Sequence, residues 1–348
     1  MSNNRRIPIK DVAKAAGVST QTVSRVTNNR PDVSPETRKH VLDVIAQLGY
    51  RPSRVARMMR GVGQTIGVVG YGLELYGPSR TLVGVQLEAQ NQDYGIVLHL
   101  VQDPDEIDIE GIMEKMLENH VDGIVWCIPD INHNMDTIRA YMEHTTVPII
   151  FTDSTPHPSI FGISVDNRLG ARLATQHLID QGHTYIGLIT GPMSYHSARE
   201  RKMGWYEALE AIDLRCDESL IEEGDWTAQG GAKAFQALIE RHPEMTAVFA
   251  SNDQIALGVL WMARRRGLHI PDDLAVIGYD DIPEAGFFEP SLSSVRQNVI
   301  QLGTQAVVEL AAIIAARHND EVVIPKMLWI QPELAIRAST HHSERESS

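Results

Sequence analysis

The 348 residues include 43% hydrophobic and 22% charged side chains, which suits about two or three globular folding units and excludes a disordered or collagen-like chain. The formal net charge of −14 argues by itself against nucleic-acid binding, but residues 1–60 hold 12 Lys/Arg and 4 Asp/Glu, a net +8, and the rest carries −22. A small basic module joined to a large acidic body indicates that the module contacts a polyanion.

The sequence also indicates the compartment. No apolar run reaches the ~18 residues of a membrane span, since even Ala306–Ala316 is interrupted by Glu309. The polar N-terminus lacks the apolar stretch of a secretory signal. Two cysteines, Cys127 and Cys216, do not make a disulfide framework. We therefore expect a cytoplasmic protein that is not associated with a membrane.

The N-terminal segment predicts two short helices joined by a tight turn. Ile9–Ala16 combines helix-forming alanines with apolar spacing, and Gly17 ends this helix. Ser19 is a typical N-cap for a second helix, Thr20–Val26. Two short helices joined by a glycine-containing turn form the helix-turn-helix arrangement.

A third helix follows this pair. Ser34 is placed to cap it, and Pro35 suits its first position. Val41, Ile45 and Leu48 give it one apolar stripe, with which it can pack on the other two helices.

The second helix carries side chains that suit the major groove. We expect Thr20, Gln21 and Arg25 to face outward. Gln can pair with adenine, Arg can pair with guanine, and a Thr methyl group can touch thymine. A three-helix bundle can also serve protein contacts, but the net charge of +8 favours DNA binding.

Residues 53–63 predict a short basic helix that ends at glycines. Arg54, Arg57 and Arg60 recur every three residues on one face, where they can meet phosphates. A helix of two turns is marginal alone, so it would form only against a second copy, DNA or both. The alternative is a plain basic linker.

These segments resemble the lactose/galactose repressor family of bacterial transcription regulators. The similarity lies in Asp11–Ser19, in Thr22–Val26 with Asn28, and in Tyr50–Pro52 before the short helix. The resemblance implies that the short helices pair across a dimer and that Met59, in place of the usual Leu, enters a minor-groove step. The expected DNA-contacting residues are then Thr20, Gln21, Ser24, Arg25, Asn28, Arg54, Ala56, Arg57 and Met59.

The body of the chain alternates short apolar strands with amphipathic helices. The first series has strands 65–70, 95–101, 121–128 and 147–153, with helices 79–93, 108–119 and 134–144. The second has strands 184–190, 220–224, 246–251 and 274–280, with helices 166–181, 195–212, 228–241 and 252–266. Late strands at 293–297, 322–330 and 334–339 indicate crossings between the two. The pattern predicts an α/β fold of two doubly wound parallel sheets, which resembles the bilobal periplasmic-binding-protein fold of the same family.

The expected domains follow from these elements. They are a helix-turn-helix head (1–52), a hinge helix and linker (53–63), an effector-binding and dimerisation core (64–340) and a polar tail (341–348). Within the core, we expect lobe one to comprise 64–163 and 293–323, and lobe two to comprise 164–290 and 324–340.

Polar residues end three of the predicted strands. In open α/β sheets, ligands bind beyond the carboxyl ends of the strands, and Asp153, Asn252 and Asp280 lie there. Carboxylates and amides suit ligand hydroxyl groups. An Asp or Asn at a strand end is also typical of a turn or an N-cap, and this alternative applies above all to the neighbouring Asp253 and Asp281.

Two further segments, 191–205 and 223–227, closely resemble the lactose-repressor branch of the family. The resemblance implies that Arg201 binds effector hydroxyls and that Trp226 stacks on a sugar face. It also implies an apolar wall in lobe one, where Thr81 replaces an Ile, while Trp205 is expected to pack in the core. The expected effector-binding residues are Leu75, Pro78, Asp153, Arg201, Trp226, Asn252 and Asp280.

The chain lacks the motifs of common enzyme classes. No Walker loop, H-E-x-x-H or C-x-x-C occurs, so we expect no enzyme, no cofactor and no bound metal. The predicted function is a sequence-specific DNA-binding regulator, a repressor released from its operator by a sugar or glycoside. The alternatives are a purine- or nucleoside-responsive regulator of the same family, and a sugar-binding transport protein, which would need a signal peptide and would not carry the basic head.

The C-terminus bears on the oligomeric state. Residues 338–348 are polar and lack the leucine heptads of the family's tetrameric member. We therefore expect a homodimer that binds a pseudo-palindromic operator with two heads. The segment 282–288, with Phe287 and Phe288, matches part of the family's dimer interface, although these rings could instead pack within one chain.

Overall fold

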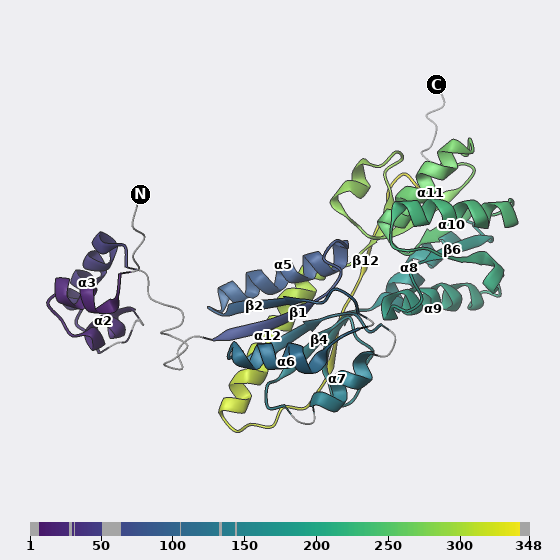
Figure 1. Ribbon diagram of the computed structural model, residues 1–348. Coiled ribbons are helices and arrows are strands. Elements are labelled where there is room, and N and C mark those ends of the chain that lie inside the picture. Colours follow the sequence, from purple (N-terminus) through teal and green to yellow (C-terminus); the bar gives the residue numbers. More distant parts are fainter. Residues whose placement is uncertain are drawn as a thin grey trace. The chain divides into compact units, whose positions relative to one another are not determined.

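The computed structural model describes residues 7–27, 30, 32–50, 64–104, 106–131, 134–142 and 145–341. The chain divides between Gln64 and Thr65 into two compact units, which we describe separately. The N-terminal unit is the helical head, and the C-terminal unit is the α/β core (Figure 1).

The head consists of α1 (Ile9–Ala15), α2 (Thr20–Thr27) and α3 (Pro35–Leu48). As expected, the Ser19 hydroxyl oxygen caps α2 by accepting the Thr22 backbone N–H at 3.0 Å. Ser34 caps α3 through the N–H of Thr37. Gly49 follows α3 with a φ of 64°, in the left-handed region that favours glycine.

The head has its own small apolar core. Val23 is fully buried, and so is Val41, as the apolar stripe predicted. The stripe on α3 is rotated by one position, because Val44 is buried while Ile45 and Leu48 are only half-buried against the same cluster. The three helices therefore bury valines of all three elements at their centre.

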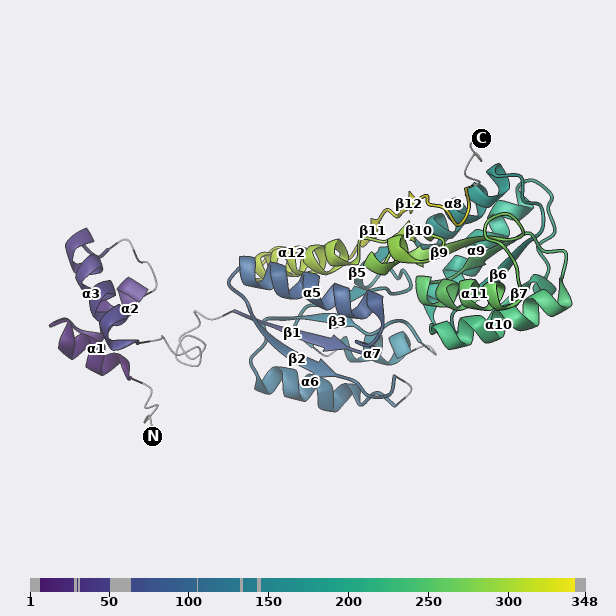
Figure 2. The ribbon, with the colours of Figure 1, turned by 90° about the horizontal axis from the view of Figure 1, so that it is seen from above.

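The first lobe of the core is a parallel sheet with helices on both faces (Figure 2). Its strands lie in the order β11-β5-β4-β3-β1-β2. Its elements are β1 (Thr65–Gly70), α5 (Tyr76–Asn91), β2 (Gly95–Leu100), α6 (Ile109–Glu118), β3 (Gly123–Cys127), α7 (Asn134–Met142), β4 (Ile149–Thr152), β5 (Phe161–Val165), α12 (Val299–His318) and β11 (Met327–Ile330).

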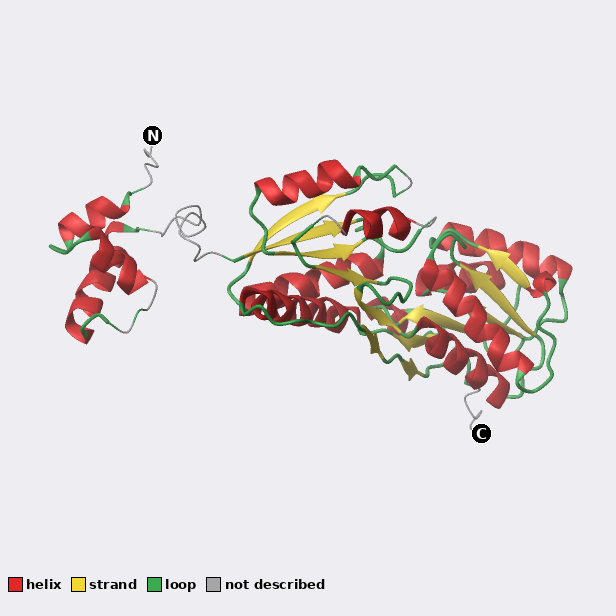
Figure 3. Ribbon diagram, turned by 90° about the horizontal axis from the view of Figure 1, so that it is seen from below, coloured by secondary structure: helices red, strands yellow, loops and turns green. Residues whose placement is uncertain are grey.

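The second lobe has the same architecture (Figure 3). Its strand order is β12-β10-β9-β8-β6-β7, parallel except for β12, which pairs antiparallel with β10. Its elements are α8 (Asn167–Asp180), β6 (Ile186–Thr190), α9 (His196–Glu210), η1 (Glu218–Leu220), β7 (Ile221–Glu223), α10 (Ala228–Arg241), β8 (Ala247–Ala250), α11 (Asp253–Arg265), β9 (Ala275–Asp280), η2 (Pro283–Phe287), β10 (Ser293–Arg296) and β12 (Glu333–Ala335).

Each sheet carries one buried apolar cluster on each face. In the first lobe, α5 and α12 cover one face and α6 and α7 cover the other. In the second lobe, α10 and α11 lie opposite α8 and α9. This arrangement confirms the predicted pair of doubly wound α/β units.

The predicted lobe boundaries were wrong in the late part of the chain. β10 pairs with β9 and belongs to lobe two, although we expected 293–323 in lobe one. β11 pairs with β5 and belongs to lobe one, although we expected 324–340 in lobe two. Short strands of similar composition do not specify which sheet they extend, because that choice depends on non-local pairing.

One β-strand and one α-helix of the core were absent from the prediction. β5 contains Gly162 and Ser164, which weaken its apolar pattern. α12 runs for 20 residues and is, by length and composition, the one described helix that could cross a membrane. Here its side chains Leu302, Val307 and Leu310 are buried in the core of lobe one.

The contact between α5 and α12 depends on two glycines. A Cβ atom on Gly84 would lie 2.1 Å from the Ile300 carbonyl oxygen, and one on Gly303 would lie 2.1 Å from the Thr81 carbonyl oxygen. Real Cβ atoms do not approach backbone oxygen so closely, so the two helices pack backbone against backbone at this point.

We predict that Gly84→Ala destabilises the core by about 1–3 kcal/mol, because the methyl group would force α5 away from α12. Urea denaturation measures this free energy. Gly77→Ala is the matched control in the same helix, since its Cβ would meet nothing within 4 Å. Equal stability of the two variants would contradict the close packing.

Candidate functional site

A cavity between the two lobes is lined by both of them. It contains about 760 Å³ of space, part of it open to solvent. All seven residues predicted to bind an effector line it, namely Leu75, Pro78, Asp153, Arg201, Trp226, Asn252 and Asp280. The strand-end rule and the family resemblance therefore converge on one place.

Twelve further residues line the cavity, and only Thr81 among them had been placed in its wall from the sequence. They come from α5, from β3 and the loop after it, from β4 and β5, from the start of α9, and from the crossing between β10 and α12. These additional residues are Tyr76, Gly77, Thr81, Cys127, Pro129, Thr152, Val165, Tyr195, Ser197, Gln297, Val299 and Leu302. Only Thr81, Tyr195 and Ser197 fell in segments that the sequence had singled out. Burial raises the pKa of the Cys127 thiol to about 11, so it is neutral.

Arg201 brings a buried cation to the cavity. The side chain extends from α9 and is only 5% exposed. Its Nε donates to the Asn167 side-chain oxygen at 2.9 Å, and its Nη1 donates to the Ser251 carbonyl oxygen. The guanidinium carbon lies 3.7 Å from the centre of the Tyr279 ring, on which the group stacks. The guanidinium is therefore fixed in one orientation.

Asp280 brings a carboxylate to the same cavity. It lies at the end of β9, 6% exposed, and accepts a hydrogen bond from the Gln297 amide. Burial raises the pKa of Asp280 to about 6, although Arg201 and the Gln297 hydrogen bond oppose the shift. Above this pH the site holds a carboxylate and a guanidinium in poorly solvated surroundings, where both strongly favour polar partners.

Trp226 provides an aromatic surface in the cavity. A Cβ atom on Gly191 would lie 2.2 Å from the indole ring, so only glycine leaves room for it. The Asn252 amide donates to the Trp226 carbonyl oxygen at 3.1 Å. The indole N–H is buried and has no hydrogen-bond partner among the described residues.

Asn252 and Asp153 differ in how they are engaged. The Asn252 side-chain oxygen accepts the Ile255 N–H at 2.7 Å and caps α11. The alternative of an N-cap therefore applies to Asn252, which also holds Trp226 in place. Asp153 follows β4 and is partly exposed in the cavity, with the Ser164 hydroxyl donating to it at 3.4 Å.

Three of the cavity residues have an unusual backbone. Asp153, Trp226 and Asp280 have φ angles of 53°, 66° and 113°. A left-handed conformation is uncommon for Asp and a genuine outlier for a bulky residue such as Trp. The surrounding hydrogen bonds hold these residues in place, and such strain clusters at functional sites.

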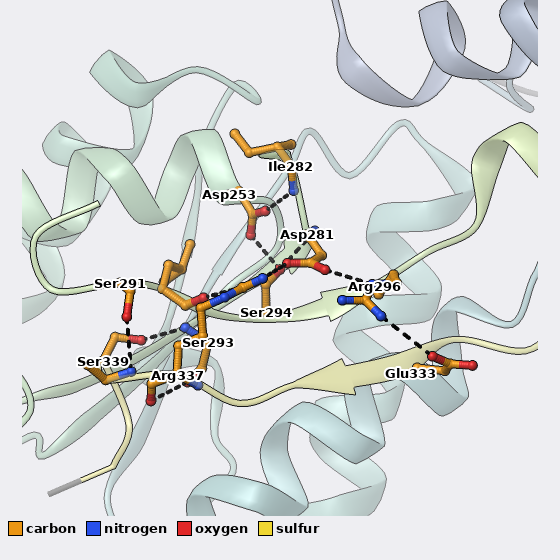
Figure 4. Close-up of polar contacts among 12 residues, drawn as sticks. Asp253, Asp281, Ile282, Ser291, Ser293, Ser294, Arg296, Glu333, Arg337 and Ser339 are labelled. Carbon is orange, nitrogen blue, oxygen red and sulfur yellow. Dashed lines mark hydrogen bonds and ion pairs between the residues drawn. The ribbon is translucent and has the colours of Figure 1, made fainter. Parts of the chain in front are cut away.

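A polar network outside the cavity fixes the end of β9 (Figure 4). Asp281 pairs with Arg296 at 2.7 Å and with Arg337 at 2.6 Å. The buried Asp253 accepts the Ser294 hydroxyl at 2.6 Å. Burial and the nearby Asp280 raise the pKa of Asp253. Both aspartates therefore support the structure beside Asp280, through these long-range contacts and not as the N-cap of α11, which is Asn252.

The head presents part of the predicted DNA surface. Thr20, Gln21 and Arg25 are exposed on α2, and Ser24 is half-buried. Arg25 pairs with Asp32 at 3.4 Å, which the sequence did not indicate. An ion pair between two such exposed side chains is weak, so DNA can displace it.

The other predicted DNA contacts are Asn28, Arg54, Ala56, Arg57 and Met59, and they lie outside the described residues. Among the residues that are described, no group of three or more His, Cys, Asp and Glu side chains is arranged to hold a metal ion.

The raised pKa of Asp280 has a consequence for stability. Its pKa is higher in the folded protein than the ordinary 3.8, so the folded state binds more protons between about pH 4 and 6. The buried charge therefore lowers the free energy of unfolding at neutral pH. This destabilisation decreases as the pH falls through about 6, because the carboxylate is then protonated.

We predict that Asp280→Asn raises the free energy of unfolding at about pH 7.5 by roughly 1–3 kcal/mol and that this gain shrinks at about pH 5. Urea denaturation at the two pH values measures the difference. The same gain at both values would show that the carboxyl does not titrate in this range.

Family models match both units of the chain. One described as "Bacterial regulatory proteins, lacI family" matches residues 8–53. A second, "Periplasmic binding protein-like domain", matches residues 175–340. The two matches coincide with the helical head and with the second part of the core.

The chain is also similar to proteins along almost its full length. It is 35% identical to HTH-type transcriptional repressor PurR from Haemophilus influenzae (strain PittEE), over 95% of this chain and 98% of that protein. The lac repressor dimer bound to operator and the anti-inducer ONPF superimposes with a TM-score of 0.84 at 30% identity, covering 97% of this chain and 99% of that one. A CelR–cellobiose complex superimposes with a TM-score of 0.69 at 31% identity, covering 96% and 100%. The chain belongs to the lacI family of bacterial regulatory proteins and is a DNA-binding, effector-responsive transcriptional repressor of that family.

Proposed function

We propose that the cavity binds a sugar or glycoside and that this ligand releases the repressor from its operator. The observation that carries the proposal is the buried guanidinium of Arg201 beside the Asp280 carboxylate and the Trp226 indole. A guanidinium can donate to two neighbouring hydroxyl oxygens, and a carboxylate can accept from hydroxyl hydrogens. An indole covers the C–H face of a pyranose.

Release follows from where the ligand would sit. It would touch Leu75 and Asp153 in lobe one, and Arg201 and Asp280 in lobe two. A ligand shifts a conformational equilibrium only by its differential affinity for the two states. Contact with both lobes supplies such a difference. We expect a coupling of about 1–3 kcal/mol between sugar and operator binding.

A purine or nucleoside effector is the second candidate, since the 35% identical relative is named PurR. A planar base binds best between two parallel aromatic faces or between a face and an apolar wall. Here the Tyr195 ring stands edge-on to Trp226, at 84° with centroids 5.8 Å apart. This arrangement and the carboxylates favour a molecule with several hydroxyl groups.

The operator is proposed to be pseudo-palindromic and bound by a homodimer in the cytoplasm. Phe287 is 90% exposed, so it does not pack within its own chain, and an interface between two copies would cover it. We propose no enzymatic activity, since relatives across the full length are transcriptional regulators.

For the DNA surface, we predict that Arg25→Ala weakens operator binding by about 1–3 kcal/mol and relaxes the preference at one base pair. Fluorescence anisotropy with the operator, with single-base variants and with random DNA measures both effects. Lys39→Ala, another exposed cation of the head, is the control that should retain the base preference. An equal loss on operator and random DNA for Arg25→Ala would contradict direct base readout.

For the effector, we predict that a thermal-shift screen of sugars, glycosides and purines identifies a sugar that lowers operator affinity. Arg201→Ala should bind the operator and lose the response, because Arg201 belongs to the α/β core and the predicted DNA contacts lie in the head and the segment after it. Trp226→Ala should lower the affinity of the protein for the sugar. If the wild type responds to a purine and to none of the sugars, the effector is a purine or nucleoside. If the sugar tightens operator binding instead of weakening it, the sugar acts as a corepressor and not as an inducer.

A further inference from the structure

A second set of contacts joins the two lobes beside the cavity. Asp130 and Thr155 belong to lobe one and follow β3 and β4. His196 is the first residue of α9 in lobe two. Asp130 and His196 are each 7% exposed. Buried polar groups are costly unless they are hydrogen-bonded. Hydrogen bonds among these side chains therefore stabilise the contact between the two lobes.

The three side chains form a chain of hydrogen bonds. The Thr155 hydroxyl donates to the Asp130 carboxylate. Its oxygen lies 3.4 Å from Nδ1 of His196. A hydroxyl has one hydrogen, which here goes to Asp130, so its oxygen must accept from His196. The contact is a hydrogen bond in the His196 tautomer that carries its hydrogen on Nδ1, and the chain of hydrogen bonds then runs from the imidazole through the hydroxyl to the carboxylate.

The backbone reinforces the relay at the same place. The His196 N–H donates to the Asp130 carbonyl oxygen at 3.2 Å. Ile131 and Tyr195 form an antiparallel bridge across the two lobes. Side-chain and backbone contacts therefore close one joint between the loop after β3 and the start of α9.

We propose that Asp130, Thr155 and His196 form an interlobe latch that holds the core in its closed arrangement and so positions the effector site. They are positioning residues, since none of the three is among the residues that line the cavity. Opening the lobes would separate His196 from Thr155 and expose all three groups to water.

The latch shares its segments with the cavity. Thr155 lies two residues after Asp153, and Asp130 directly follows Pro129, which lines the cavity. His196 lies five residues before Arg201 on the same helix, about 7.5 Å along its axis. Closing the latch therefore brings the lobe-one and lobe-two walls of the site to a fixed separation. The role of the latch in effector binding rests on the proposed function, whereas its role in holding the two lobes together does not.

The test is a measurement of lobe separation in the full-length protein without any effector. Spin labels at Glu110→Cys on α6 and Ala237→Cys on α10, with Cys216→Ser and the buried Cys127 retained, report the distance between lobes by pulsed electron–electron resonance. Dilution with unlabelled chain isolates the distances within one copy. We expect the parent to give one dominant distance.

Thr155→Val keeps the shape of the side chain and removes the hydroxyl. We expect it to raise the open-to-closed ratio about tenfold or more, because the closed state then buries the Asp130 carboxylate without this donor. His196→Leu should act in the same direction. Thr155→Ser keeps the hydroxyl group, and His196→Asn keeps an N–H donor near the position of Nδ1. Both variants should therefore give the parental distribution of spin-label distances.

The matched control is Thr340→Val, which removes a buried His–Thr contact within lobe two, where His177 Nε2 lies 2.8 Å from the Thr340 hydroxyl. It should lower stability and leave the lobe distance unchanged. A parental distribution for Thr155→Val, or failure of Thr155→Ser to restore it, overturns the latch. Because no sugar or purine is present, these results do not depend on which effector the cavity binds.

Discussion

The buried charge of Arg201 constrains the rest of the effector site. A guanidinium that is 5% exposed is tolerable only if protein groups replace its water. Asn167 at the start of α8, the Ser251 carbonyl after β8 and the Tyr279 ring in β9 provide these contacts. Asp280 adds the opposite charge. The second lobe must therefore be fully folded before the cation can occupy the cavity.

This dependence explains which parts of the site could be predicted from the sequence. Asp153, Asn252 and Asp280 were identified without any relative, because strand ends are local features and parallel sheets align them on one edge. Arg201 and Trp226 required the family resemblance, since their roles depend on non-local partners. Tyr195 and Ser197, at the start of α9, lay in a segment that was singled out, but their spacing did not indicate that they line the cavity.

The prediction of the fold was limited in the same way. Helix caps such as Ser34 involve neighbours along the chain and were predicted correctly. The partners of β10 and β11 depend on which sheet edge each strand meets, and they were assigned to the wrong lobes. The backbone contact of Gly84 with α12, and with it the cavity wall at Leu302, has no local signal because the two segments are far apart in sequence.

We propose that one cavity between the lobes recognises a sugar through a fixed cation, a carboxylate and an indole. A crystal structure of the full-length protein with the sugar that most raises its melting temperature tests this proposal. We expect a pyranose with its C–H face on Trp226 and hydroxyl groups on Arg201 and Asp280. A ligand bound outside this cavity, or one whose hydroxyl groups contact neither charged residue, would contradict it.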